Sequence, residues 1–498
     1  MPEWYSGPAS EASATLTPLL IGDLFRANAA AVPDQPAAAL DERVLTWRAL
    51  DRAANRAAHA LRALGVGHGD RVVVWADTAL EVLPLFAAAA KLGAVFAPLN
   101  ARLGAAEAAA LARLARARLL VTDAARAAEA DALARAAGVP AHAMLPLAAE
   151  REDEVREPAL AEGDPHVLFF TSGSTGRPKG VVLSHRASWL RGFQGVFRDE
   201  PERTVCMFPL FHMAAFTLAL AAWQTRGEIV LVRSPTPEAV LAAVERRRAN
   251  RLYCIPLVWA RILSADLGSY DLTSLRELDT GTSAVPIELV RALKARFPGT
   301  RTRIYYGSTE ADSVATLPDA EALAKPGSVG RASPGVELRL AESGEICVRS
   351  PFLMDAYFDD AEATAAALVD GWCRTGDLGA LDADGCLSIV GRLDDVIRSG
   401  GESIAPAEVE AALAGCAGVR EVAVVGVPDP EWGEQVCAVV VPEPGITPTL
   451  EALRAHCDGR IAGFKRPRRL VLMAELPRTA ATGQIQRALL VERINTST

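Results

Sequence analysis

The sequence contains very little lysine. Its 498 residues include 52 lysines and arginines, and the only lysines are Lys91, Lys179, Lys294, Lys325 and Lys465. Each lysine, and each position where a lysine is expected but missing, therefore needs a reason. The formal net charge is −9, and a nucleic-acid binder needs a concentrated basic face. The composition predicts no nucleic-acid partner.

Long apolar runs and targeting signals are also missing. The runs 82–90 and 213–223 are shorter than the roughly 20 residues of a membrane helix. The first residues lack the basic segment and apolar core of a signal peptide. The eight cysteines stand singly without a Cys-x-x-Cys pair, which argues against a zinc site and a thioredoxin motif. We expect a cytoplasmic protein without a membrane span.

Helical and β-branched patterns alternate in the first part of the chain. Helices are predicted over 47–64, 80–92 and 105–118, and short buried strands over 71–75, 93–98 and 119–122. Helices and strands that alternate at this pitch indicate βα units on a largely parallel sheet. The predicted fold class is α/β.

The composition of the sequence changes after residue 350, where clusters of aspartate and glycine predict turns. Strands are then predicted over 422–427, 436–441 and 470–473, between helical patterns over 406–413 and 450–458. A chain of this length exceeds a single hydrophobic core. We predict a large N-terminal domain over 1–393, built from βα-derived mixed sheets packed with helices, with 1–17 as a tail. Residues 394–498 form a small α+β domain.

A loop rich in hydroxyls and glycines follows the predicted strand 167–170. It reads Thr171-Ser172-Gly173-Ser174-Thr175-Gly176-Arg177-Pro178-Lys179-Gly180. Backbone N–H groups in such a loop can surround an anion, and Lys179 adds positive charge. It is not a Walker A loop, because Gly-Lys-Ser/Thr is absent. A plain hairpin is the alternative, but the use of a scarce lysine favours phosphate binding.

The triplet Asp279-Thr280-Gly281 matches the signature of aspartic proteases. Such an enzyme needs two aspartates that share one proton, and no second triplet occurs in the chain. The α/β context also differs from that all-β fold. This reading is rejected.

Six further motifs follow the phosphate loop in series. They are Pro209-Leu210-Phe211-His212, Tyr306-Gly307-Ser308-Thr309-Glu310, Gly327-Ser328-Val329-Gly330, Thr375-Gly376-Asp377, Gly391-Arg392-Leu393-Asp394-Asp395 and Ala405-Pro406-Ala407-Glu408-Val409-Glu410. Together with the loop, their order and spacing resemble the adenylate-forming superfamily from about Leu20 to Leu490. That superfamily includes acyl-CoA synthetases, coumarate-type CoA ligases, luciferases and the adenylation domains of peptide synthetases.

The resemblance implies an AMP-forming acyl-CoA synthetase. Such an enzyme joins a carboxylic acid to the α-phosphate of ATP, releases pyrophosphate, and transfers the acyl group to coenzyme A. The implied partners are a small-molecule carboxylic acid, ATP, Mg²⁺ and coenzyme A, in a monomer or homodimer. Carrier-protein loading, stand-alone adenylation and a diazotase-like reaction remain alternatives.

The resemblance also implies a nucleotide site. The β- and γ-phosphates would be held by Thr171, Ser172, Gly173, Ser174, Thr175, Gly176 and Lys179. Glu310 would hold Mg²⁺, which neutralises phosphate charge, and Thr309 would contact the α-phosphate. Asp377 would accept hydrogen bonds from both ribose hydroxyls, and Arg392 would add ribose or phosphate contacts. Ser283 and Tyr306, on loops beside the adenine, would stack on or hydrogen-bond the base, and Tyr305, Gly307 and Ser308 would belong to the same nucleotide site.

The implied acyl pocket begins at His212, which would border the carboxylate of the acid. Its other members are Phe211, Met213, Phe216, Gly281, Thr282 and Asp312. The small residues Ala214, Gly281 and Ala284 leave room for a medium acyl or aryl group, and Asp312 could meet an amine. A capping or surface role for Asp312 is the alternative.

The family transfers the acyl group after its C-terminal domain rotates about a hinge, and Asp394 fits that position. Rotation would bring Ser399, Gly400 and Gly401 to the site, where glycines let the backbone approach a pantetheine arm. An ordinary turn is the alternative reading of these glycines.

The family ends in a loop whose lysine reaches the carboxylate and the α-phosphate, but this chain has Gln484 there. A neutral amide cannot supply positive charge to a developing oxyanion, and such a loss commonly costs ~10²–10³ in rate. Three explanations remain open. The lysine was engineered away, the enzyme adenylates poorly or uses Arg478 or Arg487, or its reaction differs. An adenylation-impaired nucleotide- or acyl-binding form is therefore an alternative function.

Overall fold

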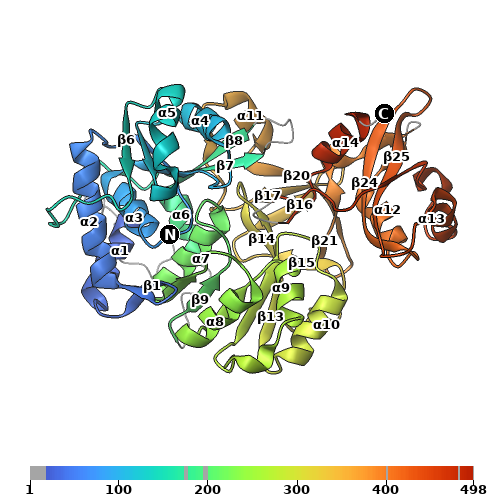
Figure 1. Ribbon diagram of the computed structural model, residues 1–498, viewed down its shortest axis with the longest axis horizontal. Coiled ribbons are helices and arrows are strands. Elements are labelled where there is room, and N and C mark those ends of the chain that lie inside the picture. Colours follow the sequence, from blue (N-terminus) through green and yellow to red (C-terminus); the bar gives the residue numbers. More distant parts are fainter. Residues whose placement is uncertain (1–17, 173–177, 194–199, 400–401, 480–482, 497–498) are drawn as a thin grey trace, which may run out of the picture.

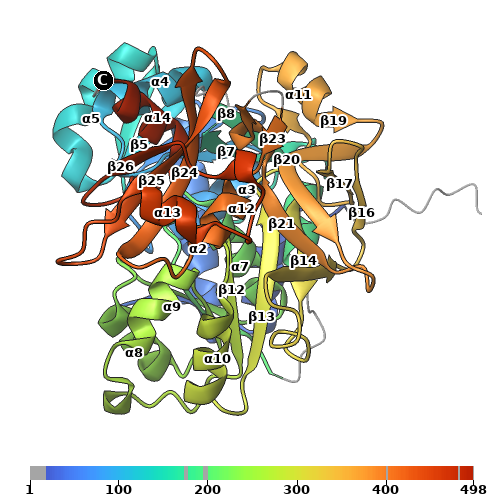
Figure 2. The same cartoon turned by 90° about the vertical axis from the view of Figure 1, so that its right-hand side faces the viewer.

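The computed structural model describes residues 18–172, 178–193, 200–399, 402–479 and 483–496. Its strands form three sheets in this part of the chain. Figure 1 shows two of them in the larger body of the molecule, with the C-terminal sheet and its helices at one side. Figure 2 views the same arrangement from that side.

The first sheet has the strand order β18-β8-β7-β4-β3-β5-β6. Its strands are β3 (Arg71–Trp75), β4 (Val95–Pro98), β5 (Leu119–Thr122), β6 (Ala141–Met144), β7 (Pro165–Ser172), β8 (Pro178–Ser184) and β18 (Ala356–Tyr357). The strands from β7 to β6 are parallel, whereas β8 and β18 are antiparallel additions. Parallel strands are buried on both faces, which explains their apolar runs.

The second sheet is longer and follows the order β16-β17-β20-β21-β15-β14-β13-β12-β11-β9-β10-β1-β2, with β19 beside β20. It consists of β1 (Pro36–Leu40), β2 (Arg43–Thr46), β9 (Arg203–Cys206), β10 (Glu228–Leu231), β11 (Arg251–Tyr253), β12 (Glu277–Gly281), β13 (Arg301–Ser308), β14 (Asp312–Leu317), β15 (Ser328–Ala332), β16 (Glu337–Leu340), β17 (Glu345–Arg349), β19 (Leu368–Val369), β20 (Trp372–Leu381) and β21 (Leu387–Arg392). The pairing is parallel from β1 to β13 and antiparallel from β13 onward.

Within the described residues, the third sheet has five strands. They are β22 (Ile397–Ser399), β23 (Glu402–Ile404), β24 (Val419–Asp429), β25 (Gly433–Pro442) and β26 (Arg469–Leu472). A short helical turn, Leu393–Asp395, connects β21 of the second sheet to β22 of the third. The exposed Asp394 lies in this turn, and its role as the domain boundary and hinge stays a prediction.

Helices cover the sheets. In chain order they are α1 (Ile21–Ala31), α2 (Trp47–Ala63), α3 (Val82–Leu92), α4 (Ala105–Leu114), α5 (Ala127–Ala137), α6 (His185–Gly192), α7 (Met213–Gln224), α8 (Pro237–Arg247), α9 (Pro256–Leu263), α10 (Ile287–Arg296), α11 (Ala361–Ala367), α12 (Pro406–Leu413), α13 (Leu450–His456) and α14 (Arg487–Thr496). Across the described residues, none of these helices combines enough length with enough apolar character to cross a membrane.

The α/β fold class is confirmed, and several predicted elements match closely. The strands predicted over 71–75 and 119–122 are β3 and β5, and the helix predicted over 47–64 is α2. The helix predicted over 105–118 is shorter, because α4 ends at Leu114 and Arg116 adopts a positive φ of 48°. Local spacing therefore predicted the elements better than their ends.

Two buried histidine rings pack together behind the first sheet. His166 of β7 and the first residue of α6, His185, have ring centroids 4.8 Å apart. The Nδ1 atom of His166 lies 3.0 Å from the Ser188 hydroxyl, and Nδ1 of His185 accepts the backbone N–H of Ile21 at 3.3 Å. Burial lowers the pKa of His185 to about 4 and that of His166 well below its ordinary value. Both rings are neutral in the folded protein near pH 7.

The lowered pKa values of His166 and His185 predict that the folded protein loses stability in mild acid. Their folded-state pKa values lie below the unfolded value of about 6.5, so the unfolded chain binds more protons below that pH. Their stabilisation is complete above about pH 6.5 and declines as the pH falls below that value, by up to about 1.4 kcal/mol per pH unit for each ring.

Urea unfolding at about pH 7.5, 6 and 5 tests this, with His166→Phe removing one buried titrating ring. We expect the free energy of unfolding of this variant to fall less steeply with acid than that of the wild type. The matched control is His142→Gln, because His142 lies outside this pair, beside Asp131. Parallel curves for wild type and His166→Phe would contradict the prediction.

Candidate active site

The candidate residues gather where parallel strands of the second sheet end. β12 ends at Gly281 and is followed by Thr282 and Ser283, while β13 carries Tyr305 to Ser308 at its carboxyl end. Carboxyl ends of parallel strands meet at one edge of a sheet, which is where α/β proteins bind ligands. Tyr305 and Tyr306 lie within β13, so the expectation that Tyr306 stands on a loop is wrong.

A glycine allows the tight turn between β13 and β14. A Cβ atom on Gly307 would lie 1.8 Å from the carbonyl oxygen of Asp312, so a side chain cannot be accommodated there. Thr309 and Glu310 occupy the turn, and the Ser308 hydroxyl accepts the backbone N–H of Ala311 at 3.1 Å. The turn therefore presents Thr309 and Glu310 at the end of the strand.

Asp377 of β20 is largely buried between two partners. The Tyr306 hydroxyl donates to one carboxylate oxygen at 2.7 Å, and Arg392 Nη1 lies 3.1 Å from the other. Burial raises the pKa of Asp377, while the Arg392 charge and the Tyr306 hydrogen bond lower it. Burial also raises the pKa of Tyr306, and the Asp377 charge adds to this, so the phenol remains protonated and donates.

Glu310 belongs to a second polar group. The Tyr357 hydroxyl donates to Glu310 Oε1 at 3.1 Å, and Lys179 Nζ lies 4.7 Å from the centre of the Tyr357 ring. Strand pairing explains the juxtaposition, because β18 places Tyr357 opposite Val181 of β8, two residues beyond Lys179. The charge of Glu310 also raises the pKa of Asp377, which couples the two groups electrostatically.

His212 caps the start of α7. Its Nδ1 accepts the backbone N–H of Ala214 at 3.2 Å, and its ring stacks on Phe208 with centroids 5.2 Å apart. Burial lowers the pKa of His212 to about 4, so the ring is neutral at pH 7. With Nδ1 accepting, the proton is on Nε2, and the ring offers one N–H donor.

An aromatic row extends from His212 through neighbouring strands. Phe208 lies 5.4 Å from Tyr253, and Tyr253 lies 6.0 Å from Tyr305, between ring centroids. Gly281 gives this row room, since a Cβ there would lie 2.7 Å from the Tyr253 hydroxyl and 2.2 Å from the Tyr305 carbonyl oxygen. The row lies beside the end of β12.

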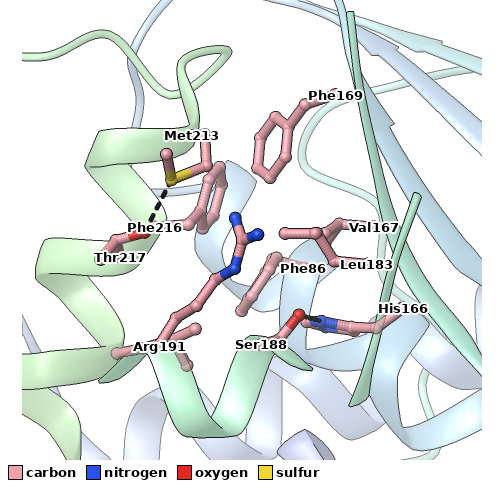
Figure 3. Close-up of a pocket in the computed structure, with 11 residues that line it drawn as sticks. Phe86, His166, Val167, Phe169, Leu183, Ser188, Arg191, Met213, Phe216 and Thr217 are labelled. Carbon is pink, nitrogen blue, oxygen red and sulfur yellow. Dashed lines mark hydrogen bonds between the residues drawn. The ribbon is translucent and has the colours of Figure 1, made fainter. Parts of the chain in front are cut away.

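Two of the predicted acyl-pocket residues, Met213 and Phe216, line a small cavity between α6, α7 and the first sheet (Figure 3). Phe211, Gly281 and Thr282 lie outside its lining. Asp312, also outside it, is buried with a φ of 59°, and one of its carboxylate oxygens has no hydrogen-bond partner among the described residues. Burial raises the pKa of Asp312.

Gln484 of the C-terminal unit binds the segment that follows β12. Its Nε2 donates to the carbonyl oxygen of Thr282 at 2.9 Å, across 202 residues of sequence. The two alternative arginines have partners within their own unit. Arg478 binds the Gly483 carbonyl at 2.8 Å and Glu421 at 2.7 Å, and Arg487 binds Glu410 at 2.7 Å.

Several predicted residues take no part in these clusters. Ser283 and Asp394 are exposed, and Ser399 is buried in β22 with no hydrogen-bond partner for its hydroxyl among the described residues. Thr171 and Ser172 end β7, where Thr171 pairs with Lys179. The remaining loop and hinge predictions lie outside the described residues, namely Gly173, Ser174, Thr175, Gly176, Gly400 and Gly401.

Sequence reasoning missed four side chains at this site. Tyr253 and Phe208 belong to the aromatic row, Tyr357 binds Glu310, and Arg191 binds the backbone of Thr309 and Glu310. The chain has only six tyrosines, so the presence of Tyr357 was a weak indication of a functional role. Arg191 gave a similar indication, because it places a charge on the face of α6 that also buries Ala187 and Ser188.

Mg²⁺ is compatible with this arrangement. Within the described ranges, no three His, Cys, Asp or Glu side chains gather into a metal site. Mg²⁺ is usually bound by one or two carboxylates together with substrate phosphates. The single carboxylate of Glu310, close to Lys179 and Tyr357, fits an ion that arrives with a nucleotide.

Family models match most of the chain. The AMP-binding enzyme model matches residues 25–358, and the AMP-binding enzyme C-terminal domain model matches residues 408–482.

Among similar proteins, an indoleacetate–CoA ligase from Aromatoleum aromaticum is 36% identical, over 90% of this chain and 93% of its own. A feruloyl-CoA synthase from Amycolatopsis is 38% identical, over 89% and 92%. The solved structure of an anthranilate CoA ligase with anthranoyl-AMP superposes with a TM-score of 0.85 at 26% identity, covering 97% of this chain and 99% of that one. The chain belongs to the adenylate-forming acyl-CoA synthetase superfamily of enzymes.

Proposed function

We propose that this enzyme joins an aromatic carboxylic acid to coenzyme A, with ATP converted to AMP and pyrophosphate. The observation that carries the proposal is the buried Asp377 carboxylate, which sits between Tyr306 and Arg392 and is coupled electrostatically to Glu310. One carboxylate that accepts ribose hydroxyls and another that holds Mg²⁺ together suit a nucleoside triphosphate.

In the first half-reaction, an oxygen of the acid carboxylate bonds to the α-phosphorus and the bond to pyrophosphate breaks. Asp377 accepts the ribose hydroxyls, and Arg392 moves from Asp377 toward the ribose or a phosphate. Lys179 adds positive charge for the β- and γ-phosphates. Glu310 would hold Mg²⁺, which neutralises phosphate charge when bound. Thr309 offers its hydroxyl to the α-phosphate.

His212 orients the acid. Its neutral ring has a single Nε2–H to offer, because Nδ1 is engaged by Ala214. A neutral donor can hold a carboxylate without neutralising it, so the acid keeps its nucleophilic charge for the attack on phosphorus.

In the second half-reaction, the sulfur of coenzyme A attacks the acyl carbon and AMP leaves. This step requires the C-terminal unit to rotate about a hinge at Asp394, so that a different segment of the unit faces the site. Gln484 would then withdraw from Thr282, and the segment after Ser399 would approach. The exposed position of Asp394 in a short turn between two sheets is compatible with this motion.

The aromatic row favours an aromatic acid. Tyr253 and Tyr305, both partly buried, lie in a row with Phe208, whose ring stacks on His212, and aromatic pairs contribute about 0.5–1.5 kcal/mol beyond area burial. Relatives named for indoleacetate, ferulate and anthranilate support the same substrate class.

A second candidate function follows from Gln484. If its amide cannot replace a cation, the protein binds nucleotide and acid but forms the adenylate slowly. The hydrogen bond from Gln484 to the Thr282 carbonyl supports this candidate, because it places a neutral side chain beside a residue of the proposed acyl pocket.

A panel of acids tests the proposed reaction. We expect AMP and pyrophosphate to form only when an acid is present, faster with aryl and arylalkanoic acids than with straight-chain acids of equal carbon number. A thioester should accumulate only when coenzyme A is added, as measured by mass spectrometry. Nucleotide binding without acid-dependent AMP formation would favour the second candidate.

Gln484→Lys tests the missing charge. A lysine there would stabilise the developing negative charge, and we expect ATP–pyrophosphate exchange to increase by up to ~10²–10³. The matched control is Gln486→Lys, which adds the same charge at an exposed position of the same segment and should change little. Equal exchange rates for wild type and Gln484→Lys would show that the glutamine does not limit adenylation.

Asp377→Asn tests the ribose site. The amide keeps the shape but loses the charge-assisted hydrogen bonds, so we expect AMP to bind about tenfold more weakly in calorimetry. Glu337→Gln is the control, because Glu337 is an exposed carboxylate in β16 of the same sheet, paired with Arg349. Unchanged AMP affinity in Asp377→Asn would exclude this ribose role.

A further inference from the structure

Arg191 is a buried cation whose hydrogen bonds go to backbone carbonyls. Its residue is 2% exposed, at the end of α6. Nε donates to the carbonyl oxygen of Phe352 at 2.9 Å, Nη1 to that of Thr309 at 2.8 Å, and Nη2 to that of Glu310 at 3.1 Å. Figure 3 shows the guanidinium extended from α6 toward Phe216 and Val167, in largely apolar surroundings.

A charged side chain is costly to bury, so the surroundings of Arg191 must match its guanidinium group closely. Burial of an unpaired cation costs several kcal/mol unless hydrogen bonds and nearby negative charge offset it. Here the carboxylates of Asp312, Glu310 and Asp355 supply the negative potential, and three carbonyl dipoles point at the donors. The planar fork of a guanidinium matches several acceptors at fixed spacing, which a compact ammonium cannot do.

The same three carbonyls belong to two segments that meet at Glu310. Thr309 and Glu310 form the turn after β13, and Phe352 precedes β18. The two segments also bind each other directly, because the Met354 N–H donates to the Glu310 carbonyl at 2.7 Å and the Tyr357 hydroxyl donates to the Glu310 carboxylate at 3.1 Å. Arg191 lies on a third element, α6, and its hydrogen bonds connect the two segments.

We propose that Arg191 is a positioning residue, which fixes the backbone of Thr309 and Glu310 so that their side chains meet the α-phosphate and Mg²⁺. This inference rests on the proposed function, since it assigns the geometry of the same nucleotide site. Arg191 does not touch the reacting atoms in this role. It acts through the two backbone carbonyls that it holds.

Arg191→Lys tests the geometry separately from the charge. A lysine keeps the positive charge but cannot span three carbonyls, so we expect kcat for acid-dependent pyrophosphate release to fall at least about tenfold. The Mg²⁺ concentration for half-maximal rate should rise, while the KM for the acid stays within about threefold. Arg191→Met, which removes both charge and donors, should lose more.

The matched control is Arg186→Met on the same helix. Arg186 is half exposed and pairs with Glu162 at 2.9 Å, away from the turn after β13, so this variant should retain the wild-type rate and Mg²⁺ dependence. If Arg191→Met does not fold, as judged by thermal unfolding, Arg191→Lys alone decides. Wild-type kcat and Mg²⁺ dependence in Arg191→Lys, or a change confined to the KM for the acid, would overturn the proposal.

A binding measurement keeps the two proposals apart. Calorimetric titration with ATP, with and without Mg²⁺, needs no acid and no turnover. We expect Mg²⁺ to tighten ATP binding in the wild type and in Arg186→Met, and to tighten it at least about threefold less in Arg191→Lys. If the wild type turned over no acid, the proposed function would fail while this titration would still test Arg191. Equal tightening in all three proteins would overturn the positioning role.

Discussion

The close approach of Gly307 to the Asp312 carbonyl is the constraint on which the site depends. It allows the second sheet to change from parallel to antiparallel pairing between β13 and β14 without a long loop. Tyr306 consequently faces Asp377, and Thr309 and Glu310 emerge at the edge where parallel strands end. A single side-chain carbon at Gly307 would separate the two strands and disperse these residues.

The five lysines differ in whether they lie near this arrangement. Four of the five lysines in the sequence pair with carboxylates away from the site: Lys91 with Asp51, Lys294 with Asp319, Lys325 with Asp382 and Lys465 with Glu408. Lys179 lies instead over the Tyr357 ring, whose hydroxyl binds Glu310. The scarce lysines thus separate into four that make these ion pairs and one, Lys179, that adds charge beside the proposed nucleotide site.

A polar contact connects the C-terminal unit to the second sheet, from Gln484 to Thr282. The carbonyl of Thr282 follows Gly281, where the backbone approaches Tyr305 and Tyr253. The contact therefore joins the third sheet to the aromatic side of the second. Because Arg478 and Arg487 bind acceptors inside their own unit, the neutral amide is the group that reaches across.

The sequence by itself determined the α/β class, most βα elements and the family, because helical and strand periodicity and ordered motifs are local properties. It also identified Asp377, Arg392 and Glu310 as candidates, and it singled out Gln484 as a departure. Only the tertiary structure placed Tyr306 within a strand and opposite Asp377, and only it brought Tyr357 and Arg191 to Glu310. The physical reason is that these partners lie 47 to 119 residues apart, and strand pairing and helix packing, not local spacing, decide which of them meet.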